Sequence, residues 1–176
     1  ATNLFHTTGT WQGAATLNGV LEWTGGTLAP QLTIAPGSTL KLSGNAAKTL
    51  GGGVITNAGT VTWTAGQFNL GGSPTFYNQP GALFDVQFDG TVFQSSGGTS
   101  TFRNEGTYRK SAGSGTHTIQ IGSFVNSGTV AVTSGTGAPR SVTPGSSASE
   151  RASASEPTYA STCAPLAASK VCCQGS

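Results

Sequence analysis

A ten-residue phrase that returns along the chain constrains the fold more than any other feature of this sequence. The phrase "NAGTVTWTAG" at residues 57–66 has relatives in "NGVLEWTGG" at 18–26, "NEGTYRKSAG" at 104–113 and "NSGTVAVTSG" at 126–135. Each phrase combines an Asn, a nearby Gly and a short alternating run. A similar phrase that returns at a similar interval predicts a fold of stacked repeats, in which each unit rests on its neighbour.

Alignment of the phrases produces two columns of mostly apolar residues at intervals of 19 to 25 positions. The first column contains Leu21, Leu40, Val61, Leu83, Tyr108 and Val130. The second column, two positions later, contains Trp23, Leu42, Trp63, Asp85, Lys110 and Val132. Because side chains two residues apart lie on the same face of a strand, we expect both columns to point into one core. A further column ends the preceding strand: Ile55, Phe76, Phe102 and Phe124.

Asparagines mark the corners between these strands: Asn57, Asn78, Asn104 and Asn126. Three of them are followed two positions later by Gly59, Gly106 and Gly128. Asn and Gly tolerate positive φ, so we expect them to turn the chain and the amides to bond the backbone or one another. The alternative is that these asparagines bind a sugar or a metal. Corner chemistry selects Asn beside Gly so strongly that the structural interpretation is favoured.

The sequence therefore predicts an all-β fold. It is a single-stranded parallel β-solenoid, or β-helix, of about six coils over residues 1–136. Coils about 4.8 Å apart would form a rod about 30 Å long. A β-sandwich or barrel would use strands spaced about 8 to 12 residues apart and would not need one phrase to return in register.

Residues 137–176 have a different composition from the repeat region. They are rich in Ser, Ala and Pro, contain all three Cys, and lack all eight Phe and all three Trp of the chain. So few large apolar side chains do not offset the entropy of ordering, which predicts a disordered tail. A second interpretation is a reading-frame error near the end of the gene, because the pattern is lost so abruptly. Resequencing would separate the two.

Composition argues against several classes of partner. Charged residues make up 8% of the chain, far below the roughly 25% of a typical soluble domain. The eight Lys and Arg are scattered and the net charge is +2, so no basic stripe points to nucleic acid. No apolar run approaches the roughly 20 residues that span a bilayer. The expected contacts are neighbouring repeats of the same chain.

The pattern "F-x-N-x-G-T" followed by an alternating strand and a Gly resembles a known class of repeat. It occurs in "FRNEGTYRKSAGSG" and "FVNSGTVAVTSG", and partly in "FYNQPGALFDV". These segments resemble repeats of bacterial autotransporter-passenger and filamentous-haemagglutinin-like β-solenoids, over residues 15–136. The resemblance implies a secreted, extracellular or cell-surface rod that forms or presents an adhesive surface to host or matrix glycans or proteins. It brings no catalytic residues.

The only acidic pair that suggests catalysis is Asp85 and Asp89 in "LFDVQFDG". Strand alternation would place both on one outward face, where paired carboxylates serve polysaccharide-cleaving β-helices as acid and base. The repeat alignment instead places Asp85 in the inward column beside Lys110, which favours a structural ion pair. The two placements conflict unless the strand bulges near Leu83.

The other candidates for chemistry are isolated. His6 and His117 have no Cys or carboxylate at metal-ligand spacing, so we expect solvated strand residues, no metal and no cofactor. Trp11 lies outside the columns and is available to stack on a sugar ring. We therefore expect a non-enzymatic stalk or adhesive scaffold within a larger exported protein. The alternative is a β-helix that binds or cleaves carbohydrate.

Overall fold

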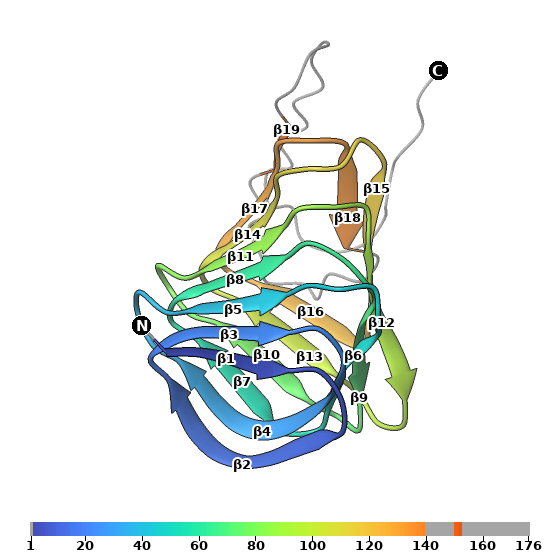
Figure 1. Ribbon diagram of the computed structural model, residues 1–176. Coiled ribbons are helices and arrows are strands. Elements are labelled where there is room, and N and C mark those ends of the chain that lie inside the picture. Colours follow the sequence, from blue (N-terminus) through green and yellow to red (C-terminus); the bar gives the residue numbers. More distant parts are fainter. Residues whose placement is uncertain (1, 140–149, 153–176) are drawn as a thin grey trace, which may run out of the picture.

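The computed structural model describes residues 2–139 and 150–152, and these residues form strands joined by short corners. The strands assemble into two sheets, and the paired strands of both sheets run parallel. The chain winds repeatedly from one sheet to the other, so that the colours follow one another in order along the stack in Figure 1. The predicted all-β parallel β-solenoid is confirmed.

The first sheet contains one strand from each coil. In their order across the sheet, these strands are β1 (Thr2–His6), β3 (Gly19–Trp23), β5 (Thr39–Leu42), β8 (Thr60–Trp63), β11 (Leu83–Val86), β14 (Thr107–Lys110), β17 (Thr129–Val132) and β19 (Glu150–Ala152).

The second sheet begins with two long strands, β2 (Thr10–Leu17) and β4 (Gly26–Ile34), and then divides. One half of β4 pairs with β6 and the other half pairs with β7. The first arm contains β6 (Lys48–Gly51), β9 (Phe68–Gly71), β12 (Thr91–Ser96), β15 (Thr116–Gln120) and β18 (Thr136–Pro139). The second arm contains β7 (Val54–Asn57), β10 (Thr75–Asn78), β13 (Thr101–Asn104) and β16 (Ser123–Asn126).

The division of the second sheet widens the rod along its length. The paired residues Leu4 and Leu21 are 17 positions apart, whereas the paired residues Phe84 and Tyr108 are 24 positions apart. The shorter N-terminal coils have two strands, and the longer coils that follow have three. Because each added strand needs inward residues of its own, the wider coils contain most of the aromatic core.

The inward columns of the first sheet lie in the predicted register except in β11, where Phe84 and Val86 occupy the positions predicted for Leu83 and Asp85. Leu40 pairs with Val61, and Tyr108 pairs with Val130. The prediction for Leu83 is wrong, because Phe84 pairs with both Val61 and Tyr108 and fills this position in the core. Leu83 lies beside this column and is only partly buried.

A longer corner causes this shift. Val61 follows its corner Asn57 by four positions, whereas Phe84 follows Asn78 by six. The two extra residues form a turn in which Ala82 N donates to Gln79 O at 3.0 Å.

Aromatic rings fill the space between the second arm and the first sheet. In the second arm, Phe76 stacks on Phe102 with ring centroids 4.7 Å apart. In the first sheet, Phe84 stacks on Tyr108 at 5.0 Å. Phe76 meets Phe84 edge-on at 5.2 Å, so each stack contacts the other in the T-shaped geometry that aromatic rings favour.

The corner glycines are required for a different reason than predicted. Gly59, Gly106 and Gly128 do not adopt the positive φ expected of them. A Cβ at Gly59 would overlap the carbonyl oxygens of Ser38 and Ala35, and the other two glycines are equally close to the coil before them. Glycine is therefore needed because successive corners stack in contact.

Most of the predicted tail lies outside the described residues. Residues 137–139 belong to β18, and residues 150–152 form β19, which pairs with β17. The interpretations of 137–176 as disordered or as out of frame stay predictions for the remainder.

Candidate functional site

The corner asparagines form a ladder along one edge of the second arm. Asn57 Nδ2 donates to Asn78 Oδ1 at 2.8 Å, Asn78 Nδ2 donates to Asn104 Oδ1 at 2.7 Å, and Asn104 Nδ2 donates to Asn126 Oδ1 at 2.6 Å. The second amide hydrogens of the first three donate to backbone carbonyls of the next coil, those of Leu83, Thr107 and Thr129.

Each end of this asparagine ladder is closed by the asparagine's own corner. Gly59 N donates to Asn57 Oδ1 at 3.1 Å, and Asn126 Nδ2 donates to Gly128 O at 3.2 Å. The four side chains are at most 2% exposed. Their polar atoms are occupied between coils, so the ladder has no free ligand groups to offer a sugar or a metal.

Asp85 points outward from the first sheet and is held by a forked ion pair. Arg109, its register partner in the next strand, donates from Nε and Nη2 to the two carboxylate oxygens at 2.9 Å each. Gln87 Nε2 adds a third hydrogen bond at 2.9 Å. Burial alone would raise the pKa of Asp85, but the hydrogen bonds from Arg109 and Gln87 outweigh it and lower the pKa.

Asp89 has a different partner. Lys110 Nζ donates to Asp89 Oδ1 at 2.8 Å, and Gly115 N donates to Oδ2 at 2.9 Å. The predicted pair between Asp85 and Lys110 is therefore wrong, and strand alternation gave the better placement of Asp85. The hydrogen bond from Lys110, followed by that from Gly115, lowers the pKa of Asp89. A general acid needs a raised pKa to keep its proton near neutral pH, and both carboxylates are shifted the other way.

Two buried lysines hold corner loops closed. Lys48 Nζ donates to the carbonyls of Ser43, Gly44 and Ala46 at 2.7 to 2.8 Å, and the residue is fully buried. Among the described residues, no carboxylate forms an ion pair with Lys48. Burial lowers the pKa of Lys48. Lys110 repeats the arrangement with the carbonyls of Ala112 and Gly113, and Asp89 neutralises it.

His117 is buried, so the prediction that it is a solvated strand residue is wrong. It is 2% exposed. Its Nδ1 bonds Gly90 O at 2.7 Å, and its Nε2 bonds the Tyr108 hydroxyl at 2.6 Å. The carbonyl can only accept, so Nδ1 carries the proton and Nε2 accepts from Tyr108. Burial, which outweighs the bond to Gly90, lowers the pKa of His117 to about 4.

An outward cluster on the second arm was not predicted from the sequence. Tyr77 and Arg103 pair in register on β10 and β13. The Arg103 guanidinium lies 5.2 Å from the Tyr77 ring centroid, and Glu105 accepts from both side chains. The next outward residue of this arm is Val125, which is 37% exposed. The repeat alignment could have found this cluster, because Tyr77, Arg103 and Val125 occupy equivalent positions. The comparison would have had to include the outward positions as well as the inward ones.

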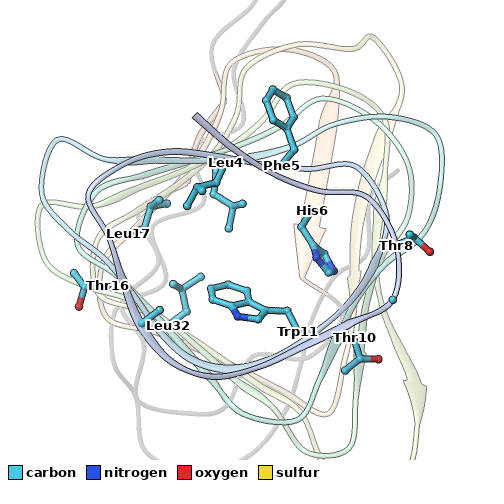
Figure 2. A pocket seen from close by; sticks show the side chains of 12 residues that line it. Leu4, Phe5, His6, Thr8, Thr10, Trp11, Thr16, Leu17 and Leu32 are labelled. Atoms are coloured by element: carbon cyan, nitrogen blue, oxygen red, sulfur yellow. The ribbon is translucent and has the colours of Figure 1, made fainter. Parts of the chain in front are cut away.

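The N-terminal end of the rod is an open apolar cavity of about 560 Å³. It is lined by Leu4, Phe5, His6, Trp11 and Leu17. Figure 2 shows Leu4, His6, Trp11 and Leu17 pointing into the coil, while Phe5 points away from it. Trp11 is thus a partly buried wall of this cavity that packs against the core, and not a freely exposed platform for a sugar ring.

Comparison of the chain with protein-family models, with curated proteins and with solved structures gives no match. The resemblance to bacterial surface solenoids stays a prediction. Over residues 2–139 and 150–152 there is no cluster of three or more His, Cys, Asp or Glu that could hold a metal ion. The same residues include no helix long and apolar enough to cross a membrane.

Proposed function

We propose that this chain is a stalk or adhesive-scaffold segment of a larger exported bacterial surface protein, acting outside the cell or on its outer surface. The observation that carries the proposal is that these polar side chains form their hydrogen bonds and ion pairs between successive coils. The asparagine ladder, the Asp85–Arg109 pair and the Asp89–Lys110 pair each join one coil to the next. Residues so engaged hold a rod together, and a rod acts through its length and its surface.

The outward cluster of Tyr77, Arg103 and Glu105 supports the adhesive half of the proposal. An aromatic ring and a guanidinium beside each other provide the stacking and hydrogen-bonding groups that recognition surfaces favour. Val125 extends the cluster with exposed apolar area. Host or matrix glycans and proteins are the partners that suit it.

Localisation is tested in the bacterium that carries the gene. Antibodies raised against the purified chain should label intact cells, and a protease added outside the cells should remove that labelling. Labelling that appears only after the cells are lysed would refute an exported rod.

Adhesion and catalysis are then separated with the purified full chain. On an array of glycans and matrix proteins, binding should fall at least tenfold in Tyr77→Ala and Arg103→Ala and be retained in Phe93→Ala, a control exposed elsewhere on β12. If the chain binds no component of the array, the adhesive role is refuted and the stalk role stands. Polysaccharide cleavage that is lost in Asp85→Asn and Asp89→Asn would replace the proposal with the carbohydrate-active alternative.

A further inference from the structure

We propose that the outward cluster of Tyr77, Arg103 and Glu105 binds neutral glycans, and that Glu105 is the residue that excludes anionic ones. This ligand class rests on the adhesive role proposed above for the same surface. In the described chain, the four strands of the second arm contain a single charged residue, Arg103. The outward positions of the first sheet, by contrast, include Glu22, Lys41, Asp85 and Arg109.

Glu105 neutralises the one charge of this arm. Arg103 Nε donates to Glu105 Oε1 at 2.7 Å, and Arg103 Nη2 donates to the same oxygen. The Tyr77 hydroxyl donates to Glu105 Oε2. The hydrogen bonds from Tyr77 and Arg103 lower the pKa of Glu105, so the carboxylate is ionised at neutral pH. The cluster therefore carries one positive and one negative charge and has no net charge to offer an ionic ligand.

The hydrogen-bonding groups that remain suit hydroxyls. A guanidinium has five N–H donors, and Glu105 accepts from two of those of Arg103. A carboxylate has about four acceptor sites, so the three bonds from Arg103 and Tyr77 leave about one on Glu105. A sugar hydroxyl both donates and accepts, so it can use both neighbours. A carboxylate or sulfate of a ligand only accepts, and it would be repelled by the charge of Glu105.

The cluster lies within an outward column that runs along the rod. In register, the column contains Thr33, Thr56, Tyr77, Arg103 and Val125. Successive strands are about 4.8 Å apart, so the column extends about 19 Å. The partly exposed ring of Tyr77 and the exposed Val125 offer apolar surface to the C–H groups of sugar rings, while the threonines add hydroxyls. A linear glycan lying along the rod would contact several of these residues at once.

The test is binding of the full chain to an array of linear tetrasaccharides. The neutral probes are tetramers of glucose, galactose, mannose and N-acetylglucosamine, and the anionic probes are tetramers of galacturonate and of sulfated galactose. We expect at least one neutral tetramer to bind about tenfold more tightly than either anionic probe, and its disaccharide to bind more weakly. Added salt should not change that affinity, because no net charge is neutralised on binding.

Glu105→Gln tests which residue sets the preference. The substitution keeps the shape of the side chain and an acceptor oxygen, but it leaves Arg103 without a counter-charge. The galacturonate tetramer should then bind about tenfold more tightly than it binds the unsubstituted chain, and added salt should weaken this binding. Glu22→Gln is a matched loss of one negative charge on β3 of the first sheet, and it should leave every affinity unchanged. Circular dichroism checks that both variants are folded.

The possible results distinguish the ligand class from the adhesive role. If an anionic probe or a matrix protein binds through Tyr77 and Arg103 and no neutral glycan does, the ligand class is wrong and the adhesive role stands. Glu105 is not the selecting residue if Glu105→Gln leaves the preference unchanged or if Glu22→Gln changes it equally. If the chain binds no glycan and no matrix protein, the adhesive role and the ligand class are both refuted.

Discussion

His117 should make the folded chain sensitive to mildly acidic pH. The imidazole is buried against Tyr108 and Gly90, and its pKa is lowered from 6.5 to about 4. The unfolded chain therefore binds a proton between pH 6.5 and 4 that the folded chain does not bind. Stability that is complete above pH 6.5 is lost as the pH falls through this window.

The size of the effect follows from the two pKa values. Each pH unit within the window lowers the free energy of unfolding by about 1.4 kcal/mol, so the fall from pH 6.5 to 5 is worth about 2 kcal/mol. Asp85 and Asp89 act in the same direction because their pKa values are lowered, but mainly below the ordinary carboxyl pKa near 4. The interval above pH 5 therefore isolates the histidine.

The assay is urea unfolding of the full chain at several pH values, followed by tryptophan fluorescence. His117→Gln keeps an acceptor for the Tyr108 hydroxyl but does not titrate. Its free energy of unfolding should be lower at pH 7 and nearly constant between pH 6.5 and 5, whereas the unsubstituted chain loses about 2 kcal/mol. Equal slopes for the two chains would refute the argument that His117 is held neutral by burial.

Three further experiments test the polar contacts of the ladder, the loop at 43–47 and the ion pair. Asn104→Ala removes the middle of the asparagine ladder and should destabilise the chain by about 2 kcal/mol in urea unfolding, while Asn18→Ala at an exposed position should have little effect. Lys48→Met leaves three carbonyls without their donor, so we expect a loss of about 1 to 3 kcal/mol and faster proteolysis of the loop at 43–47. Asp85→Ala and Arg109→Ala should couple by about 1 kcal/mol in a double-mutant cycle, since the pair is partly exposed; additive effects would contradict the forked ion pair.

The sequence predicted most of the inward columns because the strand period and the repeat interval agree. Leu83 was misplaced because the alignment treated all corners as equal in length. The signal that separates them is Pro80 followed by Gly81, which forms a turn with positive φ at the glycine. A Pro-Gly pair favours such a turn and adds two residues to the corner. Pro36 and Gly37 form the same kind of turn two coils earlier, again with positive φ at the glycine.

The polar contacts of the loops could not be predicted in the same way. Lys48 donates to the carbonyls of Ser43, Gly44 and Ala46, and because every residue has a backbone carbonyl, the sequence does not show which of them accept. His117 is buried with its Nδ1 bonded to Gly90 O, although the two residues are 27 positions apart. The alignment compares equivalent positions of successive coils. It therefore cannot detect contacts between residues at non-equivalent positions.

The asparagine ladder and the apolar columns differ in how their last residues are satisfied. An asparagine at a single rung would leave a buried amide unpaired, so a ladder has to be continued or closed at each end. Gly59 closes it at Asn57, and Gly128 closes it at Asn126. Apolar columns have no such closing hydrogen bond, since a leucine at the end of a stack remains exposed. The asparagine ladder is therefore closed within the described coils, whereas the apolar columns have no closing hydrogen bond and depend on cover from a neighbouring strand, as Leu21 has.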